Sequence, residues 1–461
     1  MPWTPELEEL RMREERANEL GGNDKIERQH RSGRLTVRER ITQLLDSDSF
    51  HEIGALAGSV KYDEHGNITD YVPSNCVMGR GLVDGRPVVV SGDDFTVRGG
   101  SADASIHEKT RYPEVMARDL RLPIIRLIEG SGGGGSVRTI ETRGRANLPG
   151  GLGQHAPYDV IGENLAMVPV VALGLGSVAG LGAARLAASH YSMMVKQTSA
   201  VFVAGPPVVE HTGEKVDKQA LGGHEIQTHA GGVDDAVDSE EAAFERTRQF
   251  LSYLPTSVFD VPPRGTPTDP APADAHTLFA SVPREPRKVY KMRKIIEAVV
   301  DANSFLEMGR MFGRPMITGL ARIDGWPVAL MASDPMFYGG AWTAQACEKL
   351  VRFIDLAQTF HLPIVYLADC PGFMVGTEAE RAGTIRKGVR ALTALNQTTV
   401  PWCTFIVRNA FGIAGGAHRP VGRYSVRYAW LTARWGSLPL QGGIEAAYRA
   451  ELGRASCRER V

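Results

Sequence analysis

Cysteine is scarce in this 461-residue sequence, and the few cysteines stand far apart. They form no CxxC pair, which argues against a zinc ribbon and favours the reduced thiols of a cytoplasmic protein. Long apolar runs are also missing, since the longest, around Met167–Leu175, is too short to span a bilayer. The charged N-terminal segment does not read as a signal peptide. The sequence therefore predicts a cytoplasmic protein without a membrane partner. The cysteines are Cys76, Cys347, Cys370, Cys403 and Cys457.

Strong net charge and several familiar reaction motifs are absent as well. The formal net charge is -1, so neither nucleic acid nor an anionic membrane is predicted as a partner. No GxSxG motif occurs, which leaves a serine-hydrolase nucleophile without local support. His224 and His229 stand five residues apart and do not share a helix face, as two metal ligands at i and i+4 would. They are expected to be surface or hydrogen-bonded histidines, and no metal site is predicted.

What the sequence does contain is a long internal repeat. "DGRPVVVSGDDFTVRGG" begins at Asp84, and "DGWPVALMASDPMFYGG" begins at Asp324, 240 residues later. The same offset aligns "EK" at Glu108 with "EK" at Glu348, and further matches lie upstream and downstream. Self-similarity over this distance indicates a duplicated domain and not a short solenoid repeat.

Each copy of the repeat has the same expected order of elements. A strand leads through a Gly-Gly pair to a helix, then to a buried strand, a glycine-bearing loop and a second helix. Alternation of strands and helices of this length predicts layered α/β domains. The proline-rich segment 263–275 is expected to be a stiff linker between an N-terminal domain, 1–262, and a C-terminal domain, 276–452.

The last nine residues, 453–461, do not fit this pattern. "GRASCRERV" holds three arginines and an unpaired cysteine, and it has no apolar period. We expect it to be a non-native tail, at which the C-terminal domain is cut short.

Two glycine turns are candidates for chemistry. Gly180-Leu181-Gly182 and Gly412-Ile413-Ala414 each follow an apolar strand. Glycine lets backbone N–H groups aim at one oxygen, and a following helix dipole strengthens this. One interpretation is therefore a pair of oxyanion holes, and the other is that the glycines only permit tight packing between strand and helix.

Two further segments leave their function open. "EGSGGGGS", Glu129–Ser136, contains a GxGxxG match, but the residues after it break a helix, so a pocket loop is favoured over a dinucleotide site. Arg34, Arg38 and Arg40 form a basic run on an expected helix. The run is either a solvated face or a contact for the phosphates of a nucleotide-like ligand.

Taken together, several longer motifs resemble one family. The chain is similar, from about Arg28 to Ala450, to the carboxyltransferase (beta) subunit of biotin-dependent acyl-CoA carboxylases, of the propionyl-CoA and methylcrotonyl-CoA type. The resemblance implies two tandem crotonase-like (ClpP/crotonase) domains, each an α/β superhelix of ββα units. The motifs are "GRLTVRERITQLLDSDSFHEIG", "VAGLGAA", "VFVAGPPVVEHTGEKVDKQALGG", "CPGFMVGTEAERAGTIRKG" and "WGSLPLQGGIEAA".

The resemblance also implies a reaction and its participants. The N-terminal domain would hold the acyl-CoA and the C-terminal domain the carboxybiotin, with oxyanion turns at Gly180-Leu181 and Gly412-Ile413. Biotin would arrive as carboxybiotin on a partner, so this chain would carry no covalent cofactor. The implied partners are a biotin carboxylase and biotin carboxyl carrier subunit and further copies of the chain, assembled as a hexamer. The implied substrate-binding residues are Gly99, Gly100, Gly132, Gly133, Gly339, Gly340, Gly372 and Phe373.

Two other functions remain open within this resemblance. A biotin-dependent acyl-CoA decarboxylase subunit would run similar chemistry in reverse. An inactive, CoA-binding scaffold would keep the fold without turnover.

Overall fold

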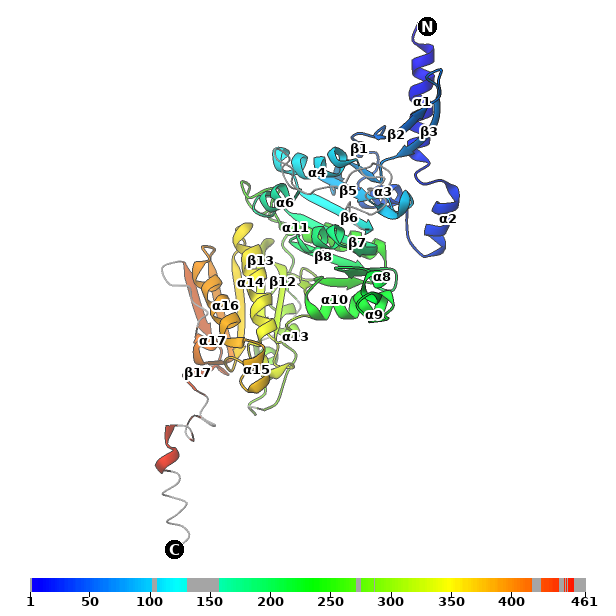
Figure 1. Cartoon of the computed structure of the whole chain (residues 1–461). Coiled ribbons are helices and arrows are strands. Elements are labelled where there is room, and N and C mark those ends of the chain that lie inside the picture. Colours follow the sequence, from blue (N-terminus) through cyan, green and yellow to red (C-terminus); the bar gives the residue numbers. More distant parts are fainter. Residues whose placement is uncertain are drawn as a thin grey trace. The chain divides into compact units, whose positions relative to one another are not determined.

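The computed structural model describes residues 2–101, 106–130, 157–270, 275–285, 287–416, 424–438, 443, 445 and 447–451. The chain divides into two compact units, Met1–Val261 and Pro262–Val461, which are blue to green and green to red in Figure 1. Among the described residues, no helix combines the length and apolarity needed to cross a bilayer.

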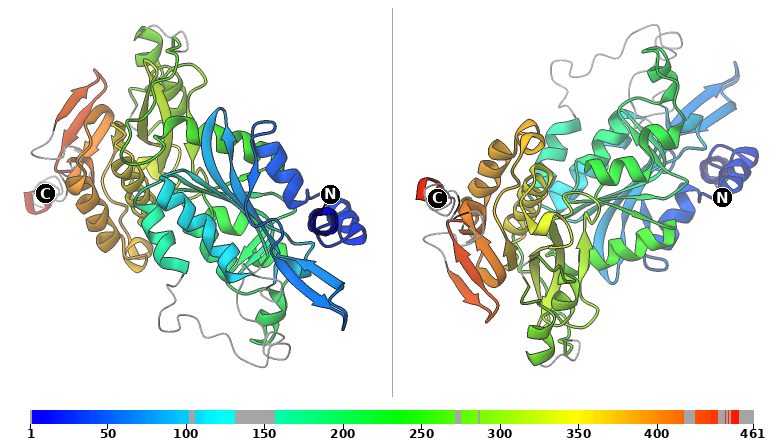
Figure 2. Two further views of the ribbon diagram at one scale, coloured as in Figure 1. Left: turned by 90° about the horizontal axis from the view of Figure 1, so that it is seen from above. Right: turned by 90° about the horizontal axis from the view of Figure 1, so that it is seen from below.

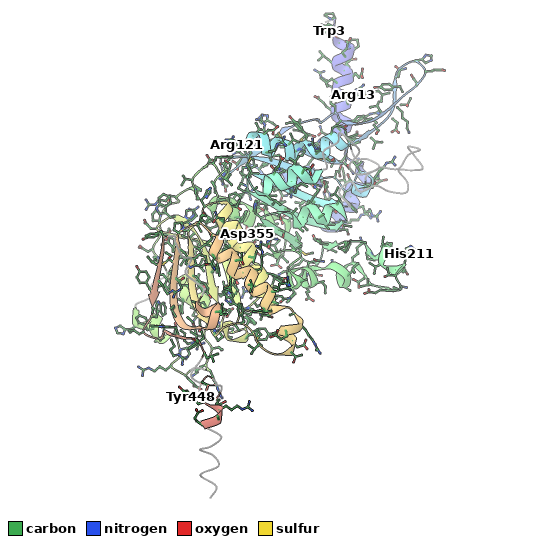
Figure 3. All side chains as sticks on the ribbon, turned by 60° about the vertical axis from the view of Figure 1, so that its left-hand side comes forward. Trp3, Arg13, Arg121, His211, Asp355 and Tyr448 are labelled. Carbon is green, nitrogen blue, oxygen red and sulfur yellow. The ribbon has the colours of Figure 1, made fainter. Side chains whose placement is uncertain are left out.

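Unit 1 begins with three helices and a separate hairpin. Helix α3 (Val37–Leu44) starts with a capping box in which the Thr36 hydroxyl accepts from the Glu39 backbone and the Glu39 carboxylate accepts from the Thr36 backbone. The preceding helices are α1 (Thr4–Asn18) and α2 (Asn23–Arg31), and the hairpin pairs β2 (Gly58–Tyr62) with β3 (Ile68–Pro73). Arg13 of α1, labelled in Figure 3, donates to the hydroxyl of Tyr62 in β2, so the hairpin and α1 lie side by side.

The main sheet of unit 1 has eight strands within the described residues. Its order is β1-β4-β5-β6-β7-β8-β10, with β9 paired to β7. The pairs from β1 to β5 are antiparallel, and those from β5 to β10 are parallel. The strands are β1 (His51–Glu52), β4 (Cys76–Val83), β5 (Arg86–Asp93), β6 (Ile124–Gly130), β7 (Val170–Ala179), β8 (Tyr191–Val195), β9 (Ala200–Phe202) and β10 (Asp235–Val237). The helices are α4 (His107–Leu120), α6 (Pro157–Leu165), α7 (Leu181–Ala187), α8 (Pro206–Glu210), α9 (Lys218–Gly222), α10 (His224–Ala230) and α11 (Glu240–Tyr253).

The sheet of unit 2 repeats this arrangement with seven strands in the described part. Its order is β11-β12-β13-β14-β15-β16, with β17 paired to β15. Helices α14 and α16 pack together and lie side by side in Figure 2. The strands are β11 (Leu306–Met308), β12 (Met316–Ile323), β13 (Trp326–Ser333), β14 (Ile364–Cys370), β15 (Trp402–Phe411), β16 (Ser425–Ala429) and β17 (Arg434–Gly436). The helices are α12 (Ala275–Ala280), α13 (Met292–Glu297), α14 (Ala344–Thr359), α15 (Thr377–Arg381), α16 (Thr384–Gln397) and α17 (Gly412–Gly416).

The repeated Asp-Gly pair is the turn of a β-hairpin in each unit. Asp84 and Gly85 between β4 and β5 have φ of 50° and 76°, and Asp324 and Gly325 between β12 and β13 have 51° and 76°. Two consecutive positive φ angles define a type I′ turn, which favours Asp-Gly. In unit 1 both N–H groups donate to the carboxylate of Asp46, at 3.0 and 2.7 Å. The sequence repeat therefore encodes the same hairpin twice.

Strand register is repeated too. Val89 of β5 pairs with Ile124 of β6, and Ala329 of β13 pairs with Ile364 of β14, so both partners shift by the same 240 residues. The central strands β6 and β14 are buried along their whole length. A fully buried parallel strand reads as a near-continuous apolar run, as "LPIVYLA" does. In "LPIIRLI" the run is interrupted by Arg126, which is buried and pairs with Glu114 at 2.7 Å.

Candidate active site

The carboxyl ends of β5, β6 and β7 meet at one edge of the unit 1 sheet, because these strands are parallel. Gly130 at the end of β6 pairs with Val178 of β7, two residues before Gly180. In unit 2, Cys370 pairs with Ala410, which is likewise two residues before the glycine turn. Each sheet therefore brings its glycine turn beside the end of the preceding strand, where open α/β sheets bind ligands.

A second glycine pair packs onto the same strand ends. Gly99 and Gly100 have φ of 64° and 65°, and a Cβ on Gly100 would lie 2.7 Å from the carbonyl oxygen of Glu129. Gly339 and Gly340 repeat this, with φ of 62° and 81°. A Cβ on Gly340 would lie only 2.3 Å from the carbonyl oxygen of Asp369. The buried second glycine of each pair therefore allows a close backbone approach, while the first is exposed.

The turn at Gly180 leads directly into α7. Gly180 has φ 56° and ψ -122°, a conformation that L side chains rarely adopt. Its N–H donates to the carbonyl oxygen of Val203 at 3.1 Å, and its carbonyl oxygen accepts from Ala184 at 3.0 Å. Gly180 thus sets the direction of the turn, while its own N–H is already bonded to Val203. The first helical N–H groups, beginning with Leu181, have no partner within the helix.

The turn at Gly412 has the same form. Gly412 has φ 63°, and a Cβ added to it would lie 3.7 Å from the carbonyl oxygen of Ser437. Ile413 follows in the short helix α17 with 68% of its surface exposed. The Ile413 side chain faces solvent and does not fill the core.

Gly372 and Phe373 hold the loop after β14 in place. The carbonyl oxygen of Gly372 accepts from the N–H of buried Trp342 at 3.0 Å. The ring of Phe373 meets the Trp342 ring edge-on, with centroids 5.9 Å apart. A Cβ on Gly388 of α16 would lie 2.5 Å from the Phe373 ring. Phe373 is half-buried, so part of it faces outward.

Two other expected binding residues, Gly132 and Gly133, lie outside the described residues, as does the tail 453–461.

A buried carboxylate stands at the end of β6. The side chain of Glu129 is fully buried and accepts from Gln29 at 2.8 Å, from Arg40 at 2.6 Å and from Arg34. Arg40 also pairs with Glu240 at 2.7 Å. Burial alone would lower the pKa of Arg40, but the two carboxylates outweigh it and raise the pKa above its usual value.

The sequence interpretation of the arginine run is therefore wrong for its buried member. Arg40 is 1% exposed, so it is neither on a solvated face nor open to a phosphate. Arg34 pairs with Glu129, and Arg38 pairs with Glu52 at 2.8 Å. These guanidinium groups link the N-terminal segment to the sheet.

Unit 2 has its own buried carboxylate at the equivalent place, 240 residues on. Asp369 of β14 accepts from the Tyr290 hydroxyl at 2.9 Å, from Arg408 at 3.0 Å and from the side chain of Asn409 at 2.7 Å. Burial raises the pKa of Asp369, while Arg408 opposes the rise. Sequence reasoning missed both carboxylates. The available signal was an acidic residue at the end of each buried repeat strand.

The two histidines singled out in the sequence do not converge. His224 begins α10, and the ring Nδ1 of His229 lies 2.6 Å from the carbonyl oxygen of Glu225 in the same helix. Among the described residues, no three His, Cys, Asp or Glu side chains are grouped as metal ligands would be.

A matched pair of buried aspartates yields a stability prediction. Asp334 accepts from Arg293 at 2.6 Å, but the equivalent Asp94 leaves Oδ2 without a partner among the described residues. Burial raises the pKa of Asp94, although Thr96 donates to Oδ1. A raised folded pKa makes the ionised form costly, so the cost grows as pH rises through that pKa.

Asp94→Asn is therefore expected to be at least as stable as the parent at pH 7, as urea denaturation of the full chain would measure. Asp334→Asn should lower the free energy of unfolding by about 1–2 kcal/mol, because Arg293 loses one partner. Any advantage of Asp94→Asn should vanish below about pH 4, where aspartate is protonated in both states. A loss of stability in Asp94→Asn equal to that in Asp334→Asn would contradict this account.

Fold and site together define a class of protein. Two α/β units repeat one ββα arrangement, and each places a glycine turn and a helix start at the carboxyl edge of its sheet. This is the duplicated, layered α/β arrangement that the sequence repeat predicted.

Comparison with known proteins identifies the family. Residues 28–460 match the carboxyl transferase domain. The carboxyltransferase subunit of propionyl-CoA carboxylase from Haloferax mediterranei is 35% identical over 450 residues, covering 97% of this chain and 85% of that protein. The beta5 subunit of a biotin-dependent acetyl-/propionyl-CoA carboxylase from Mycobacterium tuberculosis is 33% identical, covering 98% and 82%. The chain therefore belongs to the carboxyl transferase family, as the sequence motifs predicted, and is an enzyme of the transferase class.

Solved structures agree with this assignment. The transcarboxylase 12S structure with methylmalonyl-CoA and methylmalonic acid bound, described as a hexamer assembly, matches with a TM-score of 0.85 and 28% identity. The match covers 96% of this chain and 86% of that one. A single-chain, multi-domain long-chain acyl-CoA carboxylase matches with a TM-score of 0.78 over 45% of its length. The prediction of the duplicated crotonase-like fold is confirmed.

Proposed function

We propose that the chain transfers carboxylate from carboxybiotin to an acyl-CoA through two backbone oxyanion holes. The observation that carries this is the equivalence of the turns at Gly180 and Gly412. Each follows the strand that pairs with the end of β6 or β14, and each opens a helix. Membership of the carboxyl transferase family supports the reaction.

In unit 1 the turn would stabilise an enolate. Removing a proton from the α-carbon of a thioester places negative charge on the carbonyl oxygen. The N–H of Leu181, with its neighbour in the first turn of α7, would bind that oxygen while Gly180 sets the backbone direction. One such donor contributes about 3–4 kcal/mol to transition-state stabilisation.

In unit 2 the turn at Gly412 and Ile413 would bind the ureido oxygen of carboxybiotin, which gains negative charge as carbon dioxide leaves. The released biotin nitrogen is basic enough to take the α-proton, so the reaction needs no side-chain base. The nearby carboxylates of Glu129 and Asp369 are not assigned as the base, because both are buried and paired with arginine. Holding both substrates on the enzyme would supply further acceleration through proximity.

The proposal assigns the acyl-CoA to the N-terminal unit and carboxybiotin to the C-terminal unit. Gly99, Gly100, Gly339 and Gly340 would border the two pockets, since they pack on the strand ends. Biotin would be carried by a partner biotin carboxylase and carrier subunit in the cytoplasm. The relatives named for propionyl-CoA, and the methylmalonyl-CoA bound to the transcarboxylase, favour a short acyl chain. The hexamer described for that transcarboxylase favours a hexamer of this chain.

Radiolabelled bicarbonate fixation across a panel of acyl-CoAs tests the proposal. With the cognate biotin subunit and ATP present, label is expected in a short acyl-CoA and the thioester product should contain one added carboxylate. In a separate assay, release of labelled carbon dioxide from carboxyl-labelled malonyl- or methylmalonyl-CoA, without any fixation of bicarbonate, would favour a decarboxylase subunit. CoA binding without either reaction would favour an inactive scaffold.

A further inference from the structure

The two units present different side chains at one equivalent exposed position. Arg98 and Tyr338 each stand one residue before the Gly-Gly pair, with φ of 52° and 49°. The N–H of Ser101 donates to the carbonyl oxygen of Arg98 at 3.3 Å, and that of Ala341 to the carbonyl oxygen of Tyr338 at 3.1 Å. The backbone is therefore the same, and only the side chain differs.

This position lies at the edge that carries the proposed chemistry. The adjoining Gly99 has its carbonyl oxygen 3.0 Å from the place that a Cβ on Gly130 would occupy. Gly130 ends β6 and pairs with β7 just before Gly180. A non-glycine residue with positive φ is uncommon and is held by its surroundings, often at a functional site.

The charge around Arg98 is distinctive. Three other arginines near this sheet edge are neutralised: Arg34 by Glu129, Arg38 by Glu52 and Arg185 by Asp93. Arg98 is exposed, and it forms no ion pair with any other residue that the structure describes. It therefore presents a cation to an incoming ligand.

The equivalent part of unit 2 carries exposed aromatic and apolar side chains, with one exposed arginine stacked on them. Tyr338 is 67% exposed, and Met336 beside it is 48% exposed. Between them, the ring of Phe337 lies under the guanidinium of Arg314, 3.7 Å from the ring centroid. At the position that Arg98 occupies in unit 1, unit 2 thus offers an aromatic ring, and the cation nearby, Arg314, is stacked on Phe337.

We propose that the residue before the Gly-Gly pair decides whether a unit binds coenzyme A or biotin. Arg98 binds a phosphate of the acyl-CoA in unit 1, and Tyr338 packs on the uncharged ring system of biotin in unit 2. The inference rests on the proposed function. Coenzyme A carries phosphates, which a guanidinium binds with two parallel hydrogen bonds. The biotin rings carry no net charge, and an aromatic side chain supplies contact area with little conformational entropy to lose.

Calorimetric titration with free CoA tests the first half without requiring turnover. Arg98→Tyr is expected to weaken CoA binding about tenfold or more, the effect of losing one charge-assisted contact. Arg98→Lys should keep most of the affinity. Tyr338→Arg should leave CoA affinity unchanged. The natural Tyr338 shows that tyrosine is accommodated at this backbone position, so Arg98→Tyr has a matched structural precedent.

An acyl-pantetheine, which lacks the nucleotide phosphates, separates phosphate binding from other effects. Its KM should be the same for the parent and for Arg98→Tyr, whereas the KM for acyl-CoA should rise. Equal losses for both substrates, or unchanged CoA binding in Arg98→Tyr, would overturn the assignment of Arg98.

Transfer of carboxylate from methylmalonyl-CoA to free biotin, the reverse of the proposed reaction, tests the second half. Tyr338→Arg should raise the KM for biotin several-fold, and Tyr338→Phe should not, because stacking contact persists. An unchanged KM in Tyr338→Arg would overturn this half. Failure of the proposed function is a separate result: the parent would bind CoA in the titration yet transfer no carboxylate with a competent biotin partner.

Discussion

Leu181→Pro is expected to lower carboxyl transfer to acyl-CoA by roughly 100–1,000-fold, the cost of removing one oxyanion donor. Leu181 is the first residue of α7, the helix position that accepts proline most readily because its N–H has no helical partner. Gly180 before it has ψ -122°, away from the helical conformation that proline disfavours in its neighbour. The substitution therefore removes the donor with little effect on the fold.

Leu181→Ala is the matched control, because it keeps the N–H and removes only side-chain packing. It should retain most activity. Circular dichroism and light scattering would establish that both variants keep the parental fold and assembly. If Leu181→Pro folds and turns over at a near-parental rate, the glycine turn serves packing alone.

Ile413→Pro is expected to affect the other half-reaction. Ile413 is 68% exposed in α17, so its side chain contributes little to the core and Ile413→Ala should be well tolerated. Ile413→Pro should impair decarboxylation of carboxybiotin while leaving CoA binding intact, and Leu181→Pro should preserve carboxybiotin binding. Identical defects in both half-reactions would argue against two separate oxyanion holes.

Glu129→Ala is expected to lower the free energy of unfolding by about 3–5 kcal/mol, because it removes one partner of a buried ion pair. Arg40 would keep only Glu240 as a charged partner, and Arg34 would lose its carboxylate. The Glu129 side chain also fills the space beside Gly176, where a Cβ would lie 2.3 Å from Oε1. Its loss therefore leaves both an unpaired charge and a void at the end of β6.

The surface pair Lys61–Asp70 provides the control for this prediction. Its side chains are 76% and 47% exposed, and Lys61→Ala should change stability by less than about 1 kcal/mol. Urea denaturation of the full chain, together with proteolysis of the segment that contains α2 and α3, would measure both effects. A change below about 1 kcal/mol in Glu129→Ala would mean that the buried network contributes no more than an exposed pair.

The contrast between Asp94 and Asp334 shows where sequence reasoning stops. Both residues follow a repeat strand at the same offset, and the sequence treats them alike. Only the structure shows that Arg293 reaches Asp334 while Asp94 leaves one oxygen unpaired. The pairing depends on where a side chain 41 residues away in the chain points.

The sequence by itself determined the duplication, the hairpin turns and the positions of the glycine turns. These depend on local rules: Asp-Gly suits two positive φ angles, and a buried strand followed by glycine ends at a sheet edge. The tertiary structure decided which backbone N–H groups and charged side chains are engaged by a partner. Pairing of β7 with β9 lets Val203 take the N–H of Gly180, and folding brings Arg40 within hydrogen-bond distance of Glu129, 89 residues away in the chain. Hydrogen bonds and ion pairs between distant segments leave no local pattern, because they arise only once the sheet has brought those segments together.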